Sequence, residues 1–414
     1  MEDLLVDLVD ASKPSIIKVI GVGGGGDNAV AHMYREGNIC DVNYLVCNTD
    51  SKALETSPVP TQLQLGSDGL GAGGDPTKGK TLAEESVDKI RSYLNNDIKM
   101  VFVTAGMGGG TGTGAAPVIA RESKKQGILT IGIVTIPFRF EGNRKIDKAL
   151  DGVEELAENV DAILVINNER LREIYQDFPV TEAFKKADDT LTIAVRSIVD
   201  IITMHGTMIL DFRDVYTTLH DGGVAIMSTG YAKGENRVAK AIQDALNSPL
   251  INNRDIFKSK KILISISTST TSPLIVYEMN DINAFMENFE DRYIETKYGI
   301  STDDNLGEQV KITILASGFG LSDFREKKDN VVVFTADDIN KVLRRDHVYG
   351  KTEGGKTVIP HRIFLFETED LDDEEKLYLV ESTPTYKREK VMLDQIMNNK
   401  NGELVAKEKN SATS

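Results

Sequence analysis

Seven consecutive residues, Gly108 to Gly114, consist only of glycine and threonine. They follow the apolar run Met100–Val103 and precede an expected helix, Ala115–Lys125. Without Cβ atoms, a backbone turns tightly and can direct several N–H groups at one anion, at the positive end of the following helix. Threonine hydroxyls can add donors. Close packing of a strand on a helix is the alternative role for such glycines, but so long a run favours a phosphate-binding loop.

A second glycine-rich segment, Gly21 to Asn28, directly follows the apolar run Ile16–Ile20 and opens another expected helix. Its glycines fit G-x-G-x-x-G, and Asp50 lies near the end of the next expected strand, as in dinucleotide-binding proteins. Taken alone, this segment is as consistent with a nicotinamide-dependent oxidoreductase as with another nucleotide-binding protein. Two glycine segments that face one crevice favour a nucleotide with a longer phosphate chain.

A third segment, Leu70 to Thr81, contains the spacing of a Walker A motif between Gly74 and Thr81. A Walker A loop must leave a buried strand. Here the preceding residues are polar and rich in glycine, and Pro76 interrupts the string. We interpret the string as a chance match, whereas Gly71 to Gly74 could form an additional loop over the phosphates.

Apolar runs alternate with amphipathic, helix-like stretches over the first 166 residues. Continuous apolar runs suit strands that are buried on both faces of a parallel sheet. The runs are Ile16–Ile20, Tyr44–Val46, Met100–Val103, Leu129–Val134 and Ala162–Ile166, and the expected helices are Asn28–Arg35, Leu82–Leu94, Ala115–Lys125 and Lys145–Glu158. This rhythm predicts a Rossmann-like, doubly wound α/β domain whose ligand lies beyond the carboxyl ends of the strands.

A long helix is expected from Thr181 to Met204, and it would link this domain to a second, smaller α/β domain. The strands expected in the second domain are Val224–Met227, Ile262–Ser267 and Val310–Ala316. Beyond Gly320 the pattern weakens, and the acidic block Glu367–Lys376 is typical of a flexible tail. The predicted parts are residues 1–180, 181–204, 205–320 and 321–414.

The formal net charge of −16 argues against nucleic acid or an anionic membrane surface as a direct partner. The sequence has no uninterrupted membrane span, and its first ten residues lack the apolar core of a secretion signal. Cys40, Cys47 and the five histidines show no metal-ligand spacing. We therefore expect a cytoplasmic protein without membrane insertion and without protein ligands for a metal.

Together the glycine segments resemble those of the FtsZ family, the bacterial cell-division GTPases of the tubulin superfamily. GGGTGTG after an apolar strand is the signature of that superfamily. The resemblance continues through NTD at Asn48–Asp50, GAGGDPTKG at Gly71–Gly79, TIPFRFEGNRK at Thr135–Lys145, EAFKKADDTL at Glu182–Leu191 and LDFRDV at Leu210–Val215. It covers the chain from about Ile16 to Gly320 and implies the family's fold.

The resemblance also implies a site for GTP or GDP with Mg²⁺. In that site Asp188 would accept hydrogen bonds from guanine, Phe184 would stack on the base, and Glu141 would contact the ribose. Gly110, Thr111 and Gly112 would hold the β- and γ-phosphates. The other implied nucleotide-binding residues are Gly24, Gly25, Gly26, Asp27, Asn28, Asn48, Gly71, Ala72, Gly73, Gly108, Gly109, Arg144, Lys145 and Asn168. Without the family, Asp188 would be interpreted as a solvated helix residue.

The catalytic residues implied by the resemblance are Asp211 and Asp214. Their spacing at an expected loop–helix junction is by itself typical of N-terminal capping acids. In the family the matching aspartates enter the nucleotide site of the next subunit and orient the attacking water. Because they follow the long helix, they should lie opposite the sheet's carboxyl edge, beyond reach of their own chain's phosphates. The implied function is Mg²⁺-assisted GTP hydrolysis that depends on head-to-tail assembly into the filaments of the mid-cell division ring.

Three positions depart from the family's usual residues. Ile209 stands where asparagine is usual, Arg213 replaces a small residue, and Lys145 replaces an arginine near the phosphates, which Arg144 could compensate. We predict reduced rather than absent hydrolysis. The alternatives are a polymerising GTP-binding scaffold with impaired hydrolysis and, less favoured, the oxidoreductase, which leaves GGGTGTG unexplained.

The segment ESTPTYKRE at Glu381–Glu389 resembles the short tail peptide with which the family binds membrane tethers and division regulators. Its chemistry is a proline-stiffened turn with an aromatic anchor and a basic pair. A disordered tail with incidental charges is the equally consistent alternative.

Overall fold

The computed structural model describes residues 15–319, apart from 38, 40, 96, 175–178, 205, 248–255 and 290–293, together with 344–345. Residues up to Asp323 form one compact unit, which is the part discussed below. Cys40, the acidic block and the tail peptide lie outside the described residues. None of the described helices is long and apolar enough to span a membrane.

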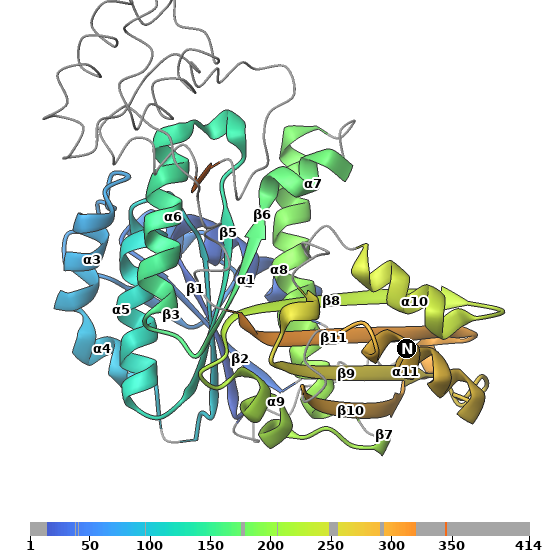
Figure 1. Ribbon diagram of the computed structural model, residues 1–414. Helices are drawn as coiled ribbons and strands as arrows, with labels where there is room; N and C mark the ends of the chain where they lie inside the picture. The colour runs from blue at the N-terminus through green and yellow to red at the C-terminus, as the bar shows by residue number, and fades with distance from the viewer. Residues whose placement is uncertain are drawn as a thin grey trace, which may run out of the picture. The chain divides into compact units, whose positions relative to one another are not determined.

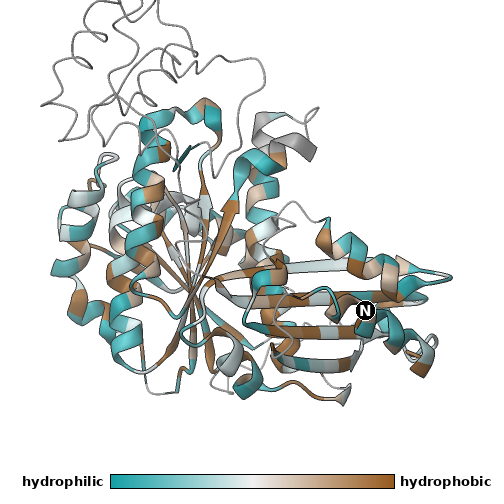
Figure 2. Cartoon of the chain, viewed as in Figure 1, coloured by the Kyte–Doolittle hydropathy of each residue, from teal (hydrophilic) through white to brown (hydrophobic). Residues whose placement is uncertain are grey.

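The described part of this unit is built on one sheet of eleven strands, in the order β3-β2-β1-β4-β5-β6-β8-β11-β9-β10-β7 (Figure 1). The first six are β1 (Ile17–Val22), β2 (Val42–Asn48), β3 (Gln62–Gln64), β4 (Met100–Gly106), β5 (Leu129–Ile136) and β6 (Ala162–Asn167). They pair in parallel throughout. Apolar residues concentrate on these strands (Figure 2), as the continuous apolar runs predict.

Helices cover both faces of the parallel strands (Figure 1). The helices of this half are α1 (Gly23–Glu36), α2 (Ser51–Glu55), α3 (Pro76–Glu85), α4 (Val87–Ser92), α5 (Thr111–Lys125), α6 (Asn143–Ala157) and α7 (Asn168–Ile174), with a 3₁₀ turn, η1 (Arg139–Glu141). Helix α1 packs with the later α8 on one face, and α5 and α6 lie on the other, with α3 and α4 outside α5. The predicted doubly wound arrangement is confirmed.

Three expected helix starts were wrong. Helix α5 begins at Thr111, four residues before the expected Ala115, so the second half of the Gly108–Gly114 run is helical. Helix α1 begins at Gly23, so the first glycine run forms helical turns rather than a loop. The expected helix Leu82–Leu94 is two helices, and the first begins six residues earlier, at Pro76. Asp75 caps that start by accepting from the N–H of Thr77 at 2.9 Å, and proline at the first helical position is favoured because its missing N–H would have no partner there.

A long helix, α8 (Val180–Thr203), joins the parallel strands to the rest of the unit and matches the expected linking helix. The following elements are β7 (Gly206–Met208), α9 (Phe212–Leu219), β8 (Gly223–Lys233), α10 (Arg237–Leu246), η2 (Ile256–Lys258), β9 (Lys261–Thr268), η3 (Val276–Glu278), α11 (Met279–Met286), β10 (Glu295–Thr302), η4 (Asp304–Leu306) and β11 (Gln309–Phe319). Strand β8 pairs with β6 in parallel, so the sheet is continuous. The short strands β3 and β7 and the half-buried β10 were not expected, and the domain boundaries remain predictions.

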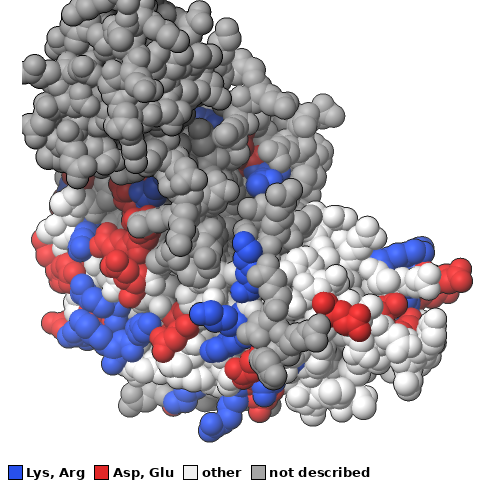
Figure 3. All heavy atoms as spheres, viewed as in Figure 1, with Lys and Arg blue, Asp and Glu red and all other residues white. Residues whose placement is uncertain are grey.

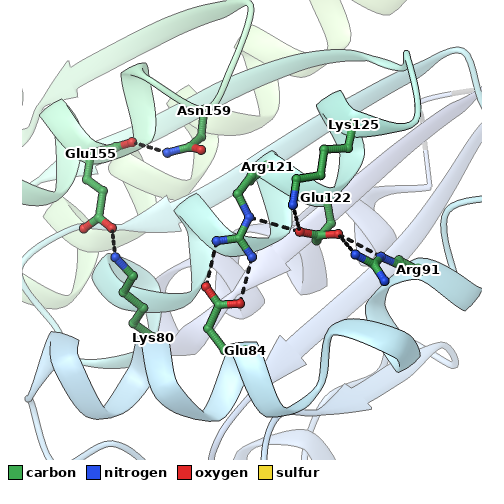
Figure 4. Close-up of polar contacts among 8 residues, drawn as sticks. All are labelled: Lys80, Glu84, Arg91, Arg121, Glu122, Lys125, Glu155 and Asn159. Atoms are coloured by element: carbon green, nitrogen blue, oxygen red, sulfur yellow. Dashed lines mark hydrogen bonds and ion pairs between the residues drawn. The ribbon is translucent and has the colours of Figure 1, made fainter.

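A network of ion pairs around a buried carboxylate ties α3 and α4 to α5 (Figure 4). The side chain of Glu122 is only 1% exposed and pairs with Arg91, Arg121 and Lys125. Burial alone would raise the pKa of this carboxyl, but hydrogen bonds from the three cations hold it at about 2. Arg121 also forms two parallel hydrogen bonds of 2.7 Å with Glu84 on α3. Side chains of both charges gather on this side of the molecule (Figure 3).

Candidate nucleotide-binding site

A cavity of about 330 Å³ lies at the carboxyl edge of the parallel strands. Gly106 ends β4, Thr135 lies near the end of β5 and Asn168 directly follows β6, and all three line the cavity. The predicted site residues that line it are Gly24, Gly25, Asn28, Gly109, Gly110, Thr111, Gly112, Glu141, Lys145, Asn168, Phe184 and Asp188. This is the position that the crevice rule predicts for a ligand of an open α/β sheet.

Two helices begin at this cavity. Helix α1 contributes Gly24 and Gly25 in its first turn, and α5 contributes Thr111 and Gly112. The N–H groups of a helix's first turn have no partner within the helix, and its N-terminus carries partial positive charge. The cavity is therefore suited to bind phosphate.

The glycines of these segments have two different roles. A Cβ on Gly26 would stand 2.3 Å from the carbonyl oxygen of Thr104, and one on Gly112 would stand 2.6 Å from that of Gly106. Gly26 therefore lets α1 pack on β4 and does not line the cavity. Gly112 lets α5 pack on β4 and also lines the cavity. Gly108, at φ +97°, forms the turn that precedes α5.

The two threonines of the glycine run also differ. The hydroxyl of Thr111 lies 2.6 Å from that of Thr49, and Thr111 lines the cavity. Thr113 is buried and accepts from the N–H of Gly108 at 2.8 Å. Thr113 therefore stabilises the loop from inside rather than offering a donor to a ligand.

The opposite end of the cavity is formed by α8, through Phe184 and Asp188. Phe184 meets Phe138 edge to face, with ring centroids 5.2 Å apart, which restrains the exposed ring. Burial raises the pKa of Asp188 to about 6; the charge of His32 lowers it and that of Asp189 raises it. At neutral pH the carboxyl of Asp188 is therefore mostly ionised. Both of its oxygens can then accept hydrogen bonds from two neighbouring N–H groups of a ligand.

Glu141 and Lys145, one helical turn apart, form an ion pair at the edge of the cavity. Glu141 is held further by the N–H of Phe138, which donates to its Oε1 at 2.9 Å. Lys145 therefore lines the cavity with its charge partly balanced. Arg144 is exposed and does not line the cavity.

The third glycine segment lies beside the phosphate loop, the turn Gly108–Gly110 and the start of α5, and does not form part of the cavity wall. The N–H of Gly71 donates to the carbonyl of Thr49 at 2.9 Å, and a Cβ on Gly110 would meet that of Ala72 at 2.8 Å. Gly71, Ala72 and Gly73 do not themselves line the cavity. Lys80 of the Walker-like string pairs with Glu155 on α6 at 2.6 Å (Figure 4), which agrees with the interpretation of that string as a chance match.

Asp211 and Asp214 lie at the other end of the unit. Asp211 accepts from the N–H groups of Arg213 (2.8 Å) and Asp214 (3.1 Å), and Asp214 accepts from the N–H of Asp211, which is a capping box at the start of α9. At the end of α9, His220 bonds Asp161, which immediately precedes β6. Helix α9 is therefore at the amino edge of the sheet, below the strands in Figure 1.

Several cavity-lining residues were missed by sequence reasoning: Gly106, Met107, Thr135, Pro137 and Ala187. The first four follow or end expected strands at the carboxyl edge, so the crevice rule could have found them. Asp27 and Asn48 were expected to contact the nucleotide, but they bond each other and do not line the cavity.

The chain matches three family models. They are the GTPase domain of the Tubulin/FtsZ family over residues 16–176, the C-terminal domain of the FtsZ family over residues 223–320, and an FtsZ C-terminal model over residues 360–403.

Curated relatives give the same result. The cell division protein FtsZ of Porphyromonas gingivalis is 48% identical over 419 residues, which span 96% of this chain and 91% of that protein. The FtsZ of Pseudomonas aeruginosa is 41% identical over 321 residues, 76% of this chain and 80% of that protein.

Among solved structures, an empty FtsZ dimer from M. jannaschii superposes with a TM-score of 0.68 at 34% identity, over 78% of this chain and 96% of that chain. CetZ2 from Haloferax volcanii, in a protofilament bound to GTPγS, gives 0.64 at 19% identity, over 80% and 98%, and shares the fold. The class of protein is therefore a tubulin-like GTPase, which implies guanine-nucleotide binding. Within that class, the chain belongs to the FtsZ family of cell division proteins.

Proposed function

We propose that this protein binds GTP with Mg²⁺, polymerises head to tail, and hydrolyses GTP where two copies meet, in the cytoplasmic division ring at mid-cell. The observation that carries this proposal is the separation of two sets of residues. The cavity lies at the carboxyl edge of the sheet, and Asp211 and Asp214 lie at its amino edge. Strand β6 has six residues, so the two edges are about 20 Å apart. The aspartates can then reach only the nucleotide of another copy.

Exposed apolar side chains near both ends support assembly. At the nucleotide end, Leu70 is 81% and Phe140 is 59% exposed. Next to Asp211, Met208 and Ile209 are 46% and 67% exposed. Large apolar side chains gathered on a surface favour a contact that removes them from water. A contact between these two ends would generate an open filament.

The proposed chemistry is phosphoryl transfer to water. The first turns of α1 and α5 would hold the phosphates, and Asp211 and Asp214 of the neighbouring copy would orient the water. Mg²⁺ usually keeps several waters and binds phosphate oxygens. The part of the cavity lined by Gly109, Gly110, Thr111 and Gly112 has no carboxylate, which fits a metal ion that arrives with the nucleotide. There Mg²⁺ would spread the charge of the γ-phosphate.

The proposal also assigns roles to the α8 end of the cavity and to the tail. Asp188 and Phe184 would recognise guanine, with Asn28 and Asn168 beside them. The tail, which includes the segment Glu381–Glu389 inside the matched range 360–403, would bind membrane tethers and division regulators without nucleic acid or membrane insertion.

A filament-forming scaffold with weak turnover is the second candidate. The observation that favours it is Ile209, an exposed apolar residue two positions before Asp211, where the family usually has asparagine. Pelleting with GTP and Mg²⁺ or with GDP, with phosphate release followed in the same tube, separates the two candidates. The scaffold would pellet with GTP and release phosphate only at the background rate.

A mixing experiment tests the shared site directly. The Asp211→Asn variant keeps a capping oxygen and an intact cavity but lacks the carboxylate. Asp188→Ala has the intact aspartate pair and a damaged base site. Each variant alone should release little phosphate, whereas the mixture should release more than the sum of the two, because one variant supplies the nucleotide and the other the carboxylate. The control partner carries both substitutions and should restore nothing. Full turnover by wild-type monomers at high dilution would refute the proposal.

A further inference from the structure

One short segment, Asn48 to Asp50, contacts all three glycine segments. The side chain of Asn48 bonds Asp27 on α1, and the hydroxyl of Thr49 bonds that of Thr111 at the start of α5. The carbonyl of Thr49 accepts from the N–H of Gly71, and Asp50 forms an isolated bridge with Leu70. The relative positions of the three segments therefore depend on how this segment is held.

Asp27 holds the α1 side of the segment. Its side chain is 6% exposed, and its Oδ2 accepts from Asn48 Nδ2 at 2.6 Å. Asn48 Oδ1 in turn accepts from the N–H of Asp50 at 3.1 Å, so the amide is oriented at both ends. The neighbouring Gly25 and Asn28 line the cavity, whereas Asp27 does not.

The carboxyl of Asp27 is suited to this buried place in its uncharged form. Its Oδ1 is buried without a hydrogen-bond partner among the described residues. Burial, the largest effect, raises the pKa of Asp27 to about 8, and hydrogen bonds from the side chain of Asn48 and from the backbone N–H of Cys47 oppose that rise. A neutral carboxyl still accepts from Asn48 and adds no negative charge beneath a phosphate site. Asparagine at this position would reproduce that acceptor.

We propose that Asp27 is a positioning residue for the nucleotide. Through Asn48 it fixes the Asn48–Asp50 segment, and through Thr49 it sets the hydroxyl of Thr111 at the phosphate end of the cavity. This inference rests on the proposed nucleotide site. It assigns to Asp27 an effect on affinity without contact with the ligand.

Binding of GTPγS, measured by calorimetry at pH 7 on folded full-length protein, tests the proposal. Asp27→Val removes the acceptor and should weaken binding about tenfold, because binding must then also order the released Asn48–Asp50 segment, at a cost comparable to that of one buried hydrogen bond. Asn48→Ala should weaken binding by a similar factor. The loss of affinity in the double variant should be clearly less than the sum of the two single losses, because both substitutions break the bond between Asp27 and Asn48. Asp27→Asn should restore affinity to within about twofold of wild type, because its amide oxygen accepts the same bond.

The control is Asp161→Asn, which alters an equally buried aspartate at the opposite edge of the sheet. It should lower the melting temperature without changing affinity. Additive losses, or wild-type affinity in Asp27→Val, would overturn the positioning role while the nucleotide site stands. Failure of the wild-type protein to bind GTPγS would instead refute the proposed function.

Discussion

Gly79 on α3 lies directly against the carbonyl of Gly110 at the start of α5: a Cβ at position 79 would stand 2.3 Å from that oxygen. The same two helices meet again at Gly114 on α5, where a Cβ would stand 2.0 Å from the carbonyl oxygen of Pro76 on α3. Gly79, the second glycine of the Walker-like string, is therefore needed for the packing of α3 against the start of α5. It does not line the cavity.

Replacing Gly79 by alanine should push α3 away from Gly110 and shift the phosphate loop. We expect a loss of about 1–3 kcal/mol in the free energy of unfolding, as for other overpacked contacts, and about tenfold weaker GTP binding. Urea unfolding and calorimetric titration measure the two effects. Thr81→Ala, an exposed substitution on the same helix, is the control and should change neither. Unaltered affinity in Gly79→Ala would contradict this coupling.

Lys80→Ala distinguishes a packing string from a true Walker A motif. Because Lys80 pairs with Glu155 on α6, its loss should leave the dissociation constant of GTP within about twofold and the free energy of unfolding within about 1 kcal/mol. A phosphate-binding lysine would instead cost orders of magnitude in affinity. Lys78→Ala, which removes a neighbouring exposed lysine, provides the comparison.

GTP binding should weaken at acid pH through Asp188. Burial raises the pKa of this carboxyl to about 6, and only its ionised form can accept from both guanine N–H groups. Protonation as the pH falls through 6 therefore removes the acceptor, so the dissociation constant should rise about tenfold between pH 7 and pH 5. Asp188→Asn should bind weakly and show no such dependence. A flat pH profile for the wild-type protein would argue against this role of Asp188.

Ile209→Asn should raise GTP turnover in filaments by about tenfold, because the introduced amide would help to position the reacting groups. Because Ile209 is exposed, the change should alter the free energy of unfolding by less than about 0.5 kcal/mol. Phosphate release per pelleted subunit is the measurement. Tyr231→Asn, another exposed apolar-to-polar change, is the control. Equal rates in Ile209→Asn and wild-type filaments would show that residue 209 does not limit turnover.

Local pattern was sufficient for much of the fold. The apolar runs identify β1, β2, β4, β5 and β6, since buried parallel strands need no polar face. The run Gly108–Gly114 identifies the phosphate loop, and the length of α8 separates Asp211 from the cavity. Edge strand β7 escaped prediction because three residues carry no periodicity.

The sequence by itself thus determined the class of ligand, the parallel sheet and the far position of the aspartates. Only the tertiary structure decided which of the candidate residues face the cavity. Gly24 does and Gly26 does not; Lys145 does and Lys80 does not. The physical reason is that a side chain's partner depends on elements distant in the chain, as with Thr49 and Thr111, which are 62 positions apart. Residue propensities and the spacing of apolar residues indicate a segment's own secondary structure and which of its residues are buried. They do not indicate which other segment it packs against.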